Sequence, residues 1–576
     1  MNFEFNLTLE ELTKRTDKDF LIRKPMLKET AEEYNNLAEG DKVALKHLCK
    51  AANWANQIYM KQDNELNLPF LSFINEEINK GNKIAELTKI LFEAQLGIIG
   101  IDSESKSVIL LKGAKELDGK GFYPSDITKE ELHSILKAML KNGEKEEVKK
   151  ILNQRTIVKR DGNKLKAFDY TEEFKEEFTA IANELKEAAK YSTNADFNEY
   201  LLLQAKALEE NDAMLDAYAD KKWATLQDTP LEFTLSREQY ADLLTGSVIE
   251  DTELNQLLLD NDITAISKDS IGIRVGIVNK EGTQDLLKVK NYLPLMAENM
   301  PLKELYEQNI SSDEDNLQTM VDADIVSLRG DEGSYRGGIT IAQNLPNNDK
   351  LSLTIGGGRR NVYHRQVRTN TSEDAKARRQ KRLDATLNKD LHQYYNIEAD
   401  HWFTIGHENV HSLGPKSGTE ALGKYKNIIE ENKADMGALA LVDCLTEAKV
   451  YTEQQRKEIL VTFGADCFLK AKPELSQAHR VRTVMQAYFF MQEGAIEVSE
   501  DGIINVNIDK MVPTATKMLT EIIQVQLSKD FAVGENFIKK YFVWTKEMDI
   551  LSKKLKEIDK SLNGIVQTPL ADFLCK

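Results

Sequence analysis

The chain has 576 residues, of which 41 % are hydrophobic, and this is enough to build more than one hydrophobic core. Its 94 acidic and 76 basic residues give a formal charge of −18, which disfavours generic nucleic-acid binding. Four cysteines without a CxxC pair, and the lack of any run of about 18 apolar residues, predict a cytoplasmic protein that does not enter a membrane.

The first 130 residues have the pattern of a helical scaffold. Between 9 and 96, apolar residues recur at a spacing of three to four among charged ones, which predicts helices. Two short strands are expected at 98–101 and 108–111. Thr128 then has the features of a helix N-cap, because acidic residues follow in the first turn.

Residues 171–226 again predict helices, with Thr171 as the expected cap of the first one. One apolar stripe there is explained by core packing and comprises Phe174, Phe178, Ile181, Leu185 and Ala189. Between 231 and 355 apolar and polar residues alternate, which predicts five or six strands. Glycine clusters at 337–338 and 356–358 lack the spacing of a phosphate-binding loop, so we interpret them as strand-end turns.

A basic island precedes the last part of the chain. Residues 359–382 contain nine Lys or Arg, and a solvated helix or a hinge explains them more simply than an anion site. From 383 onward the pattern is helical. We therefore expect an α+β protein, mainly α, with a mixed lobe at 1–370, whose strand-rich part is 231–358, and a mainly helical lobe at 371–576.

The helical lobe contains a His-Glu-x-x-His pattern formed by His407, Glu408 and His411. Residues four apart lie on one face of a helix, so both imidazoles can bind one Zn²⁺ ion. Glu408, one step round the helix, can reach a metal-bound water. A catalytic zinc site has three protein ligands, and two histidines therefore need a third.

Acidic residues further along the chain are candidates for that ligand. Glu430, Glu431 and Asp435 interrupt an otherwise apolar helical run at 427–441. Glu431 and Asp435 are one turn apart and can face the same partner, which places Asp435 to accept the free N–H of a ligating imidazole. By themselves these acids could also form a solvated helix face, and the residues alone do not decide between Glu430 and Glu431.

The paired motifs resemble those of the M49 peptidases, the dipeptidyl peptidase III family. That family pairs an HExxGH or HExxH helix with an EExxAE or EExxAD helix, and this chain has the five-residue form of the first motif. Segments 121–126, 341–349 and 413–415 also look like segments of bacterial members. The resemblance covers roughly residues 121 to 494 in order and spacing.

The resemblance implies that the two motif histidines and Glu431 bind one zinc ion per chain. It also implies that Glu408 is the general base and later the proton donor, while Glu430 and Asp435 support the ligands. A fold of two lobes separated by a cleft is implied as well, with a mainly helical catalytic lobe and a mixed lobe that contains a small β-barrel-like sheet.

Three further residues are candidates for substrate contacts. His479 matches a family histidine that hydrogen-bonds the substrate carbonyl or the tetrahedral oxyanion, although a lone histidine is more often structural. Asn344 and Asn347 match an Asn-x-Pro-Asn segment that binds the substrate's N-terminal part. Asparagine can donate to a peptide carbonyl and accept from an ammonium, but Asn-Pro turn chemistry also explains the segment.

Two features depart from the family pattern. Its Gly-x-Ile-Glu-x-Tyr segment, whose Glu holds the substrate amino terminus, is nearest at 246–252, where Glu250 is the candidate and the Tyr is absent. Family members also hold substrate with an Arg near the C-terminus, whereas no Arg follows Arg482 in this chain.

The function implied by the resemblance is that of a monomeric zinc metallopeptidase. It would hydrolyse short peptides, releasing dipeptides from their N-terminus, with no nucleic-acid or membrane partner. The two departures keep an alternative open, a zinc-containing peptide-binding protein of the same fold with weak or no catalysis. A zinc hydrolase of non-peptide amides is the other alternative, because the metal chemistry is shared.

Overall fold

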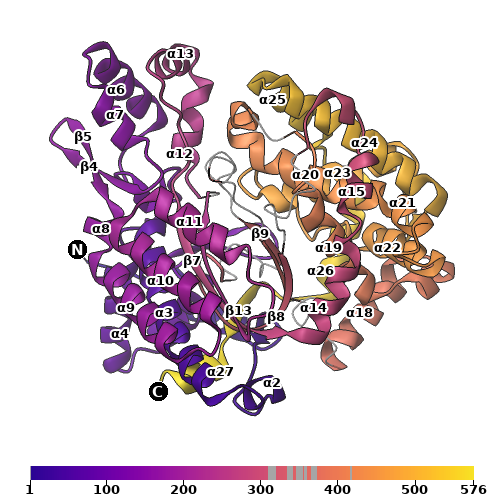
Figure 1. Ribbon diagram of the computed structural model, residues 1–576, viewed down its shortest axis with the longest axis horizontal. Helices are drawn as coiled ribbons and strands as arrows, with labels where there is room; N and C mark the ends of the chain where they lie inside the picture. The colour runs from indigo at the N-terminus through magenta and orange to yellow at the C-terminus, as the bar shows by residue number, and fades with distance from the viewer. Residues whose placement is uncertain are drawn as a thin grey trace.

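The computed structural model describes residues 2–239, 241–308, 319–333, 342–345, 355, 360–364, 373–415 and 418–576. Within them, apolar side chains gather in two main cores. Figure 1 shows the helices that carry the first core in indigo to magenta and those that carry most of the second in orange to yellow. The fold is α+β and mainly helical, as predicted. None of the helices described is both long and apolar enough to cross a membrane.

The N-terminal segment forms a small core of its own, built on Phe70, Phe92 and their neighbours. The elements around it are α1 (Leu9–Thr16), α4 (Asn67–Asn79), α5 (Lys83–Gln95), β2 (Ile99–Ile101) and β3 (Ser107–Ile109), whereas Tyr34 of α2 (Glu32–Asn35) packs against the first main core. The two short strands predicted here are confirmed and pair as an antiparallel hairpin. The strand β1 (Leu21–Pro25) was not predicted, because its partner β13 (Asn563–Gln567) lies at the other end of the chain.

The first main core lies between long helices and the central sheet. Its helical elements are α3 (Glu39–Asp63), α6 (Lys129–Lys141), α7 (Lys145–Ile151), α8 (Tyr170–Glu173), α9 (Lys175–Tyr191), α10 (Ala195–Glu210), α11 (Ala213–Trp223), α12 (Leu243–Gly246), η2 (Ser247–Glu250) and α13 (Thr252–Asp260). Thr128 caps α6 as predicted, since its side chain accepts from the Glu131 N–H. The prediction that Thr171 caps a helix is wrong, because Asp169 caps α8 by accepting from the Thr171 N–H at 2.9 Å.

The central sheet has five described strands, four of which lie within residues 231–358, the part of the chain predicted to be rich in strands. Its strands, in spatial order, are β6 (Leu231–Glu238), β7 (Ser270–Asn279), β8 (Thr319–Gly330), β10 (Arg360–Tyr363) and β9 (Ala342–Leu345). Strands β6, β7 and β8 are antiparallel, β10 is parallel to β8, and β9 is antiparallel to β10. Residues 339–341 and 351–353, also predicted as strands, lie outside the described residues, and Ile355 is in a turn rather than a strand.

The sheet runs through the middle of the molecule (Figure 1). Almost every residue of β6, β7 and β8 is buried, so both faces of the sheet are covered. Helix α3 covers one face, while α14 (Lys280–Lys290) packs against β8. The hairpin of β4 (Thr156–Asp161) and β5 (Lys164–Asp169), which was not predicted, extends this half of the molecule.

The second main core is helical. Its elements are α15 (Leu293–Glu298), η3 (Lys303–Leu305), α18 (Glu373–Thr386), η5 (Lys389–Tyr394), α19 (Ile397–Val410), η6 (Thr419–Tyr425), α20 (Lys426–Ala440), α21 (Val442–Glu447), α22 (Glu453–Asp466), α23 (Ala478–Gln492), β11 (Ile496–Val498), β12 (Ile504–Val506), α24 (Ile508–Ser528), α25 (Phe531–Tyr541) and α26 (Lys546–Ile558). The predicted boundary between 370 and 371 lies outside the described residues, so that division of the chain stays a prediction.

The last segment of the chain returns to the first core. Helix α27 (Pro569–Leu574) buries Leu570 and Leu574 against it, and Figure 1 shows this yellow helix among the indigo and magenta ones. The N-terminal and C-terminal parts of the chain therefore pack together, because β1 pairs with β13 and α3 contacts α27.

The basic island divides into two different environments. Most basic side chains of α18 are exposed, as predicted for a solvated helix. Arg360 is instead fully buried in β10, with its Nη2 atom 2.6 Å from Glu232 Oε2 in β6. The interpretation of the island as solvated is therefore wrong for Arg360, whose partner is remote in the sequence.

Candidate metal centre

Helices α19 and α20 pack closely and bring the two predicted motifs together. The close approach depends on glycine, because a Cβ atom on Gly437 would lie 2.4 Å from Val410 Cγ1. On the facing helix, a Cβ atom on Gly406 would lie 3.2 Å from Ala438 Cβ. Small residues at this crossing therefore set the separation at which the histidines of α19 meet the acids of α20.

Three side chains converge between these helices. His407 Nε2 lies 3.1 Å from His411 Nε2 and 3.5 Å from Glu431 Oε2. The distance from His411 Nε2 to Glu431 Oε1 is 3.8 Å. One ligand atom from each of the three residues lies within 4.8 Å of the others, so together they could hold a metal ion.

The other ring nitrogen of each histidine contacts a carboxylate. His407 Nδ1 is 2.7 Å from Asp435 Oδ1, and His411 Nδ1 is 3.0 Å from Glu430 Oε1. Contacts with carboxylates favour a proton on Nδ1 of each ring, and the tautomer with its only proton there leaves the Nε2 lone pair available to a metal ion. A metal ion between the two nitrogens, or a proton on one of them, removes the repulsion between these lone pairs.

The donor set fits a zinc ion. Two nitrogens bound tetrahedrally at about 2.05 Å would be about 3.3 Å apart, close to the separation of the two Nε2 atoms. Two imidazoles and one carboxylate are also a ligand set typical of catalytic zinc, with carboxylates behind the imidazoles.

Glu408 lies beside these residues on α19 and is buried. Burial raises the pKa of its carboxyl, although the neighbouring His407 and His411 oppose the shift. A carboxyl with a raised pKa is better suited to take up and release a proton near neutral pH than an ordinary glutamate.

Side chains of helix α23 contact the acidic residues of α20. His479 Nδ1 lies 3.2 Å from Glu431 Oε2, and the His479 side chain is 61 % exposed. Arg482 donates from Nη1 to Glu431 Oε2 at 2.7 Å, and Gln486 donates from Nε2 to Asp435 Oδ2 at 2.9 Å. These two contacts were not predicted, although Arg482 and Gln486 lie three and seven residues after His479 and therefore on the same face of a helix.

The carboxylate of Glu431 stays ionised in this setting. Burial alone would raise its pKa, but His479, His411 and Arg482 together hold the pKa well below the ordinary value. A charged carboxylate is the form that a metal ion requires.

Of the predicted substrate-binding residues, only Glu250 has a described side chain, and its ion-pair partners are not residues of this cluster. Asn344 is in β9, where its main chain pairs with Asn361, while its side chain and all of Asn347 lie outside the described residues. The carboxylate of Glu250 forms ion pairs with Lys129 Nζ at 3.0 Å and with Lys424 Nζ at 2.5 Å. Its charge is therefore already balanced.

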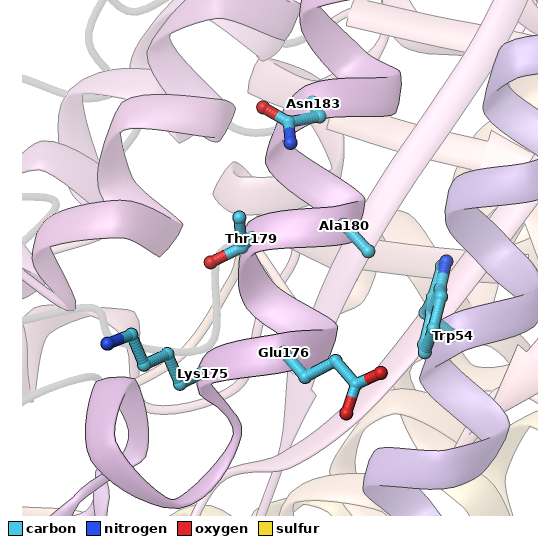
Figure 2. Close-up of a pocket in the computed structure, with 6 residues that line it drawn as sticks. All are labelled: Trp54, Lys175, Glu176, Thr179, Ala180 and Asn183. Atoms are coloured by element: carbon cyan, nitrogen blue, oxygen red, sulfur yellow. The ribbon is translucent and has the colours of Figure 1, made fainter.

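A shallow pocket lies between α3 and α9 (Figure 2). It has a volume of about 580 Å³ and is lined by Trp54, Lys175, Glu176, Thr179, Ala180 and Asn183. None of the predicted site residues is among them, so we assign the chemistry to the cluster between α19, α20 and α23.

Comparison with known sequences gives limited information. No protein-family model matches the chain. A protein from Arabidopsis thaliana named Nudix hydrolase 3 is 23 % identical over 312 residues, which cover 52 % of this chain. The matched part is 39 % of that plant protein, so the chain spans about two fifths of this relative.

Comparison with solved structures identifies the fold. Dipeptidyl peptidase III from Caldithrix abyssi is 22 % identical with a TM-score of 0.76, covering 98 % of this chain and 100 % of that one. Dipeptidyl-peptidase III from Corallococcus sp. strain EGB is 21 % identical with a TM-score of 0.80, covering 99 % of this chain and 98 % of that one. The two-lobe fold implied by the motif resemblance is therefore confirmed over nearly the whole chain.

Proposed function

We propose that the chain is a zinc-dependent metallopeptidase of the dipeptidyl peptidase III family, M49. The observation that carries the proposal is the pair of facing imidazole Nε2 atoms beside Glu431, each ring fixed by a carboxylate, in a chain with that fold. The proposal includes a monomeric, cytoplasmic enzyme with one zinc ion per chain and short peptides as its partners, acting without nucleic acid or membrane.

A zinc ion held by the two motif histidines and Glu431 would act as a Lewis acid and lower the pKa of its water. Glu408 would take a proton from the water that attacks the scissile carbonyl carbon and would deliver it to the amine that leaves as the C–N bond breaks, a role that its raised pKa supports. His479, exposed and within 3.2 Å of Glu431, would donate a hydrogen bond to the scissile carbonyl oxygen as negative charge develops there.

The substrate would be a short peptide that adds as a strand at the β9 end of the sheet. In the described part of the sheet, β9 is the terminal strand. Main-chain hydrogen bonds at such an edge supply affinity, and the side chains of Asn344 and Asn347 would orient the peptide's N-terminal part so that a dipeptide is released.

A second candidate function is peptide binding by a protein of the same fold with weak or no catalysis. The observation that favours it is Glu250, the residue matched to the holder of the substrate amino terminus, whose carboxylate is already paired with two lysines. The Tyr that follows this Glu in the family is also absent here.

The decisive test compares the wild type with Glu408→Ala. We expect both proteins to bind about one zinc per chain, while hydrolysis of dipeptidyl arylamides falls by roughly 10²–10⁴-fold in the variant because the general base is lost. Zinc is measured by atomic absorption and cleavage of mixed short peptides by mass spectrometry. Glu398→Ala, in the first turn of the same helix, is the control and should keep its turnover.

Unchanged turnover in a zinc-loaded Glu408→Ala variant would contradict the mechanism. A wild type that binds peptides and zinc but cleaves no peptide would instead favour the peptide-binding function.

A further inference from the structure

Lys433 is a buried lysine in the middle of the acidic motif of α20. Its side chain is 1 % exposed. The ammonium donates to the Leu413 carbonyl oxygen at 2.6 Å and forms an ion pair with Glu430 Oε1 at 2.8 Å. A buried charge is tolerated when it is paired and hydrogen-bonded in this way.

The Glu430 carboxylate connects this lysine to a predicted metal ligand. Its Oε1 atom also lies 3.0 Å from His411 Nδ1, and its Oε2 atom accepts from Gln526 Nε2 at 2.9 Å. Three donors therefore fix the plane of the carboxylate, and the direction of the His411 ring follows from it.

The Leu413 carbonyl gives Lys433 a second connection to the same ligand. Leu413 lies two residues after His411, where the chain leaves α19. The following Gly414 has a φ of +85°, and a Cβ atom there would lie 3.1 Å from Lys433 Cδ. The lysine thus fixes both the hydrogen-bond partner of His411 and the main chain next to it.

His407, the other motif histidine, has a carboxylate partner that is held by different residues. His407 contacts Asp435, which is held from α23 by Arg482 Nε at 3.1 Å and by Gln486. The His407 side therefore depends on α23, whereas the His411 side depends on Lys433 within α20 itself and on Gln526 of α24.

We infer that Lys433 is a positioning residue for metal binding, which holds Glu430 and Leu413 so that His411 Nε2 faces His407 Nε2. This inference rests on the zinc function proposed above. It assigns to Lys433 an effect on metal affinity as well as on folding.

The test is the zinc affinity of full-length Lys433→Met, measured by competition with a chromophoric chelator. Methionine keeps the length and the apolar stem but removes the ammonium, and we expect zinc to bind roughly 10–100-fold more weakly, as is typical when a partner of a metal ligand is lost. Lys268→Met is the matched control, because Lys268 is equally buried in the first core and donates to three oxygens there. It should alter stability and leave zinc affinity unchanged.

A folded Lys433→Met protein with the zinc affinity of the wild type would overturn the inference and leave the proposed function intact. A wild type that binds no zinc would overturn both. Should Lys433→Met fail to fold, Glu430→Gln tests the same connection, because it keeps the shape of the side chain but weakens its hold on His411. Zinc binding should then weaken by a similar factor, and an unchanged affinity would again overturn the inference.

Discussion

Lys268 is enclosed entirely by the first core. Its Nζ donates to the carbonyl oxygens of Ile151 and Asn153, both at 2.7 Å, and to Thr156 Oγ1 at 2.9 Å. Burial nevertheless lowers its pKa to about 7, although the charges of Asp242 and Asp269 oppose the shift. The lysine therefore changes charge in the folded protein at a pH where it stays protonated in the unfolded chain.

This difference predicts a specific pH dependence of stability. Between about pH 7 and 10.5 the unfolded chain binds more protons at Lys268 than the folded one, so this residue makes the free energy of unfolding rise with pH in that window. Below about pH 7 both states are protonated, and the contribution becomes constant. Urea unfolding of the wild type and Lys268→Met across this range should give a stability difference that shifts in favour of the wild type as the pH rises. A difference independent of pH would contradict the prediction.

At the level of residues, spacing predicts contacts within a helix and misses contacts between distant segments. The four-residue spacing of His407 and His411 is sufficient to expect two imidazoles on one face, and α19 places them so. The pairing of Glu250 with Lys129 and Lys424 has no local signal, because these partners are 121 and 174 positions away. Local patterns therefore predicted the clustering of the candidate metal ligands, whereas they did not predict the ion-pair partners of Glu250.

At the level of elements, the helices were predictable because their apolar period is local. In the predicted stripe, Phe178, Ile181 and Leu185 are buried on α9. Phe174 is buried just before this helix, and Ala189 is partly buried. In contrast, β1 and β13 are five-residue strands that pair in parallel from opposite ends of the chain. No short-range signal marks such a pair, since each strand is stabilised only by the other and by the core beneath it.

The docking of α27 shows what this long-range packing contributes. Leu570 is fully buried in the first core, whereas Phe573, on the same helix, is 51 % exposed. We expect Leu570→Ala to lower the free energy of unfolding by roughly 2–5 kcal/mol, because it leaves a cavity, and Phe573→Ala to lower it by much less. Urea unfolding followed by fluorescence measures both changes. Equal effects of the two substitutions would show that α27 does not dock as described.

At the scale of the whole molecule, the candidate metal ligands lie on helices of the second core, and these helices contact other parts of the molecule. Tyr363 of β10 donates to the Ile405 carbonyl of α19 at 3.4 Å. Arg480, next to His479, donates to the Ser103 carbonyl in the turn between β2 and β3 at 3.0 Å. Helix α19 is therefore hydrogen-bonded to the central sheet, and α23 is hydrogen-bonded to the N-terminal segment.

A further contact between the two main cores is the one between η2 and η6. Gly423 has a φ of +54°, and a Cβ atom on it would lie 2.7 Å from Ile249 Cγ2, so this close approach requires glycine. Beside it, Glu250 bridges Lys129 of α6 and Lys424 of η6. Because η6 leads directly into α20, the bridge connects the first core to the helix that carries Glu431.

We predict that Glu250 acts through Lys424 rather than by binding the substrate amine. Glu250→Gln and Lys424→Met should then raise KM for a dipeptidyl arylamide by the same factor, roughly two- to five-fold, as expected for a partly exposed ion pair worth roughly 0.4–1 kcal/mol. The double variant should be no worse than Glu250→Gln alone, because the Glu250–Lys424 ion pair is already lost in that single variant. Lys426→Met, two residues along and paired with Glu420 at 3.6 Å, is the matched control and should leave KM unchanged. If Glu250→Gln raised KM and Lys424→Met did not, the carboxylate would contact the substrate itself, and the amine-binding role implied by the family resemblance would hold.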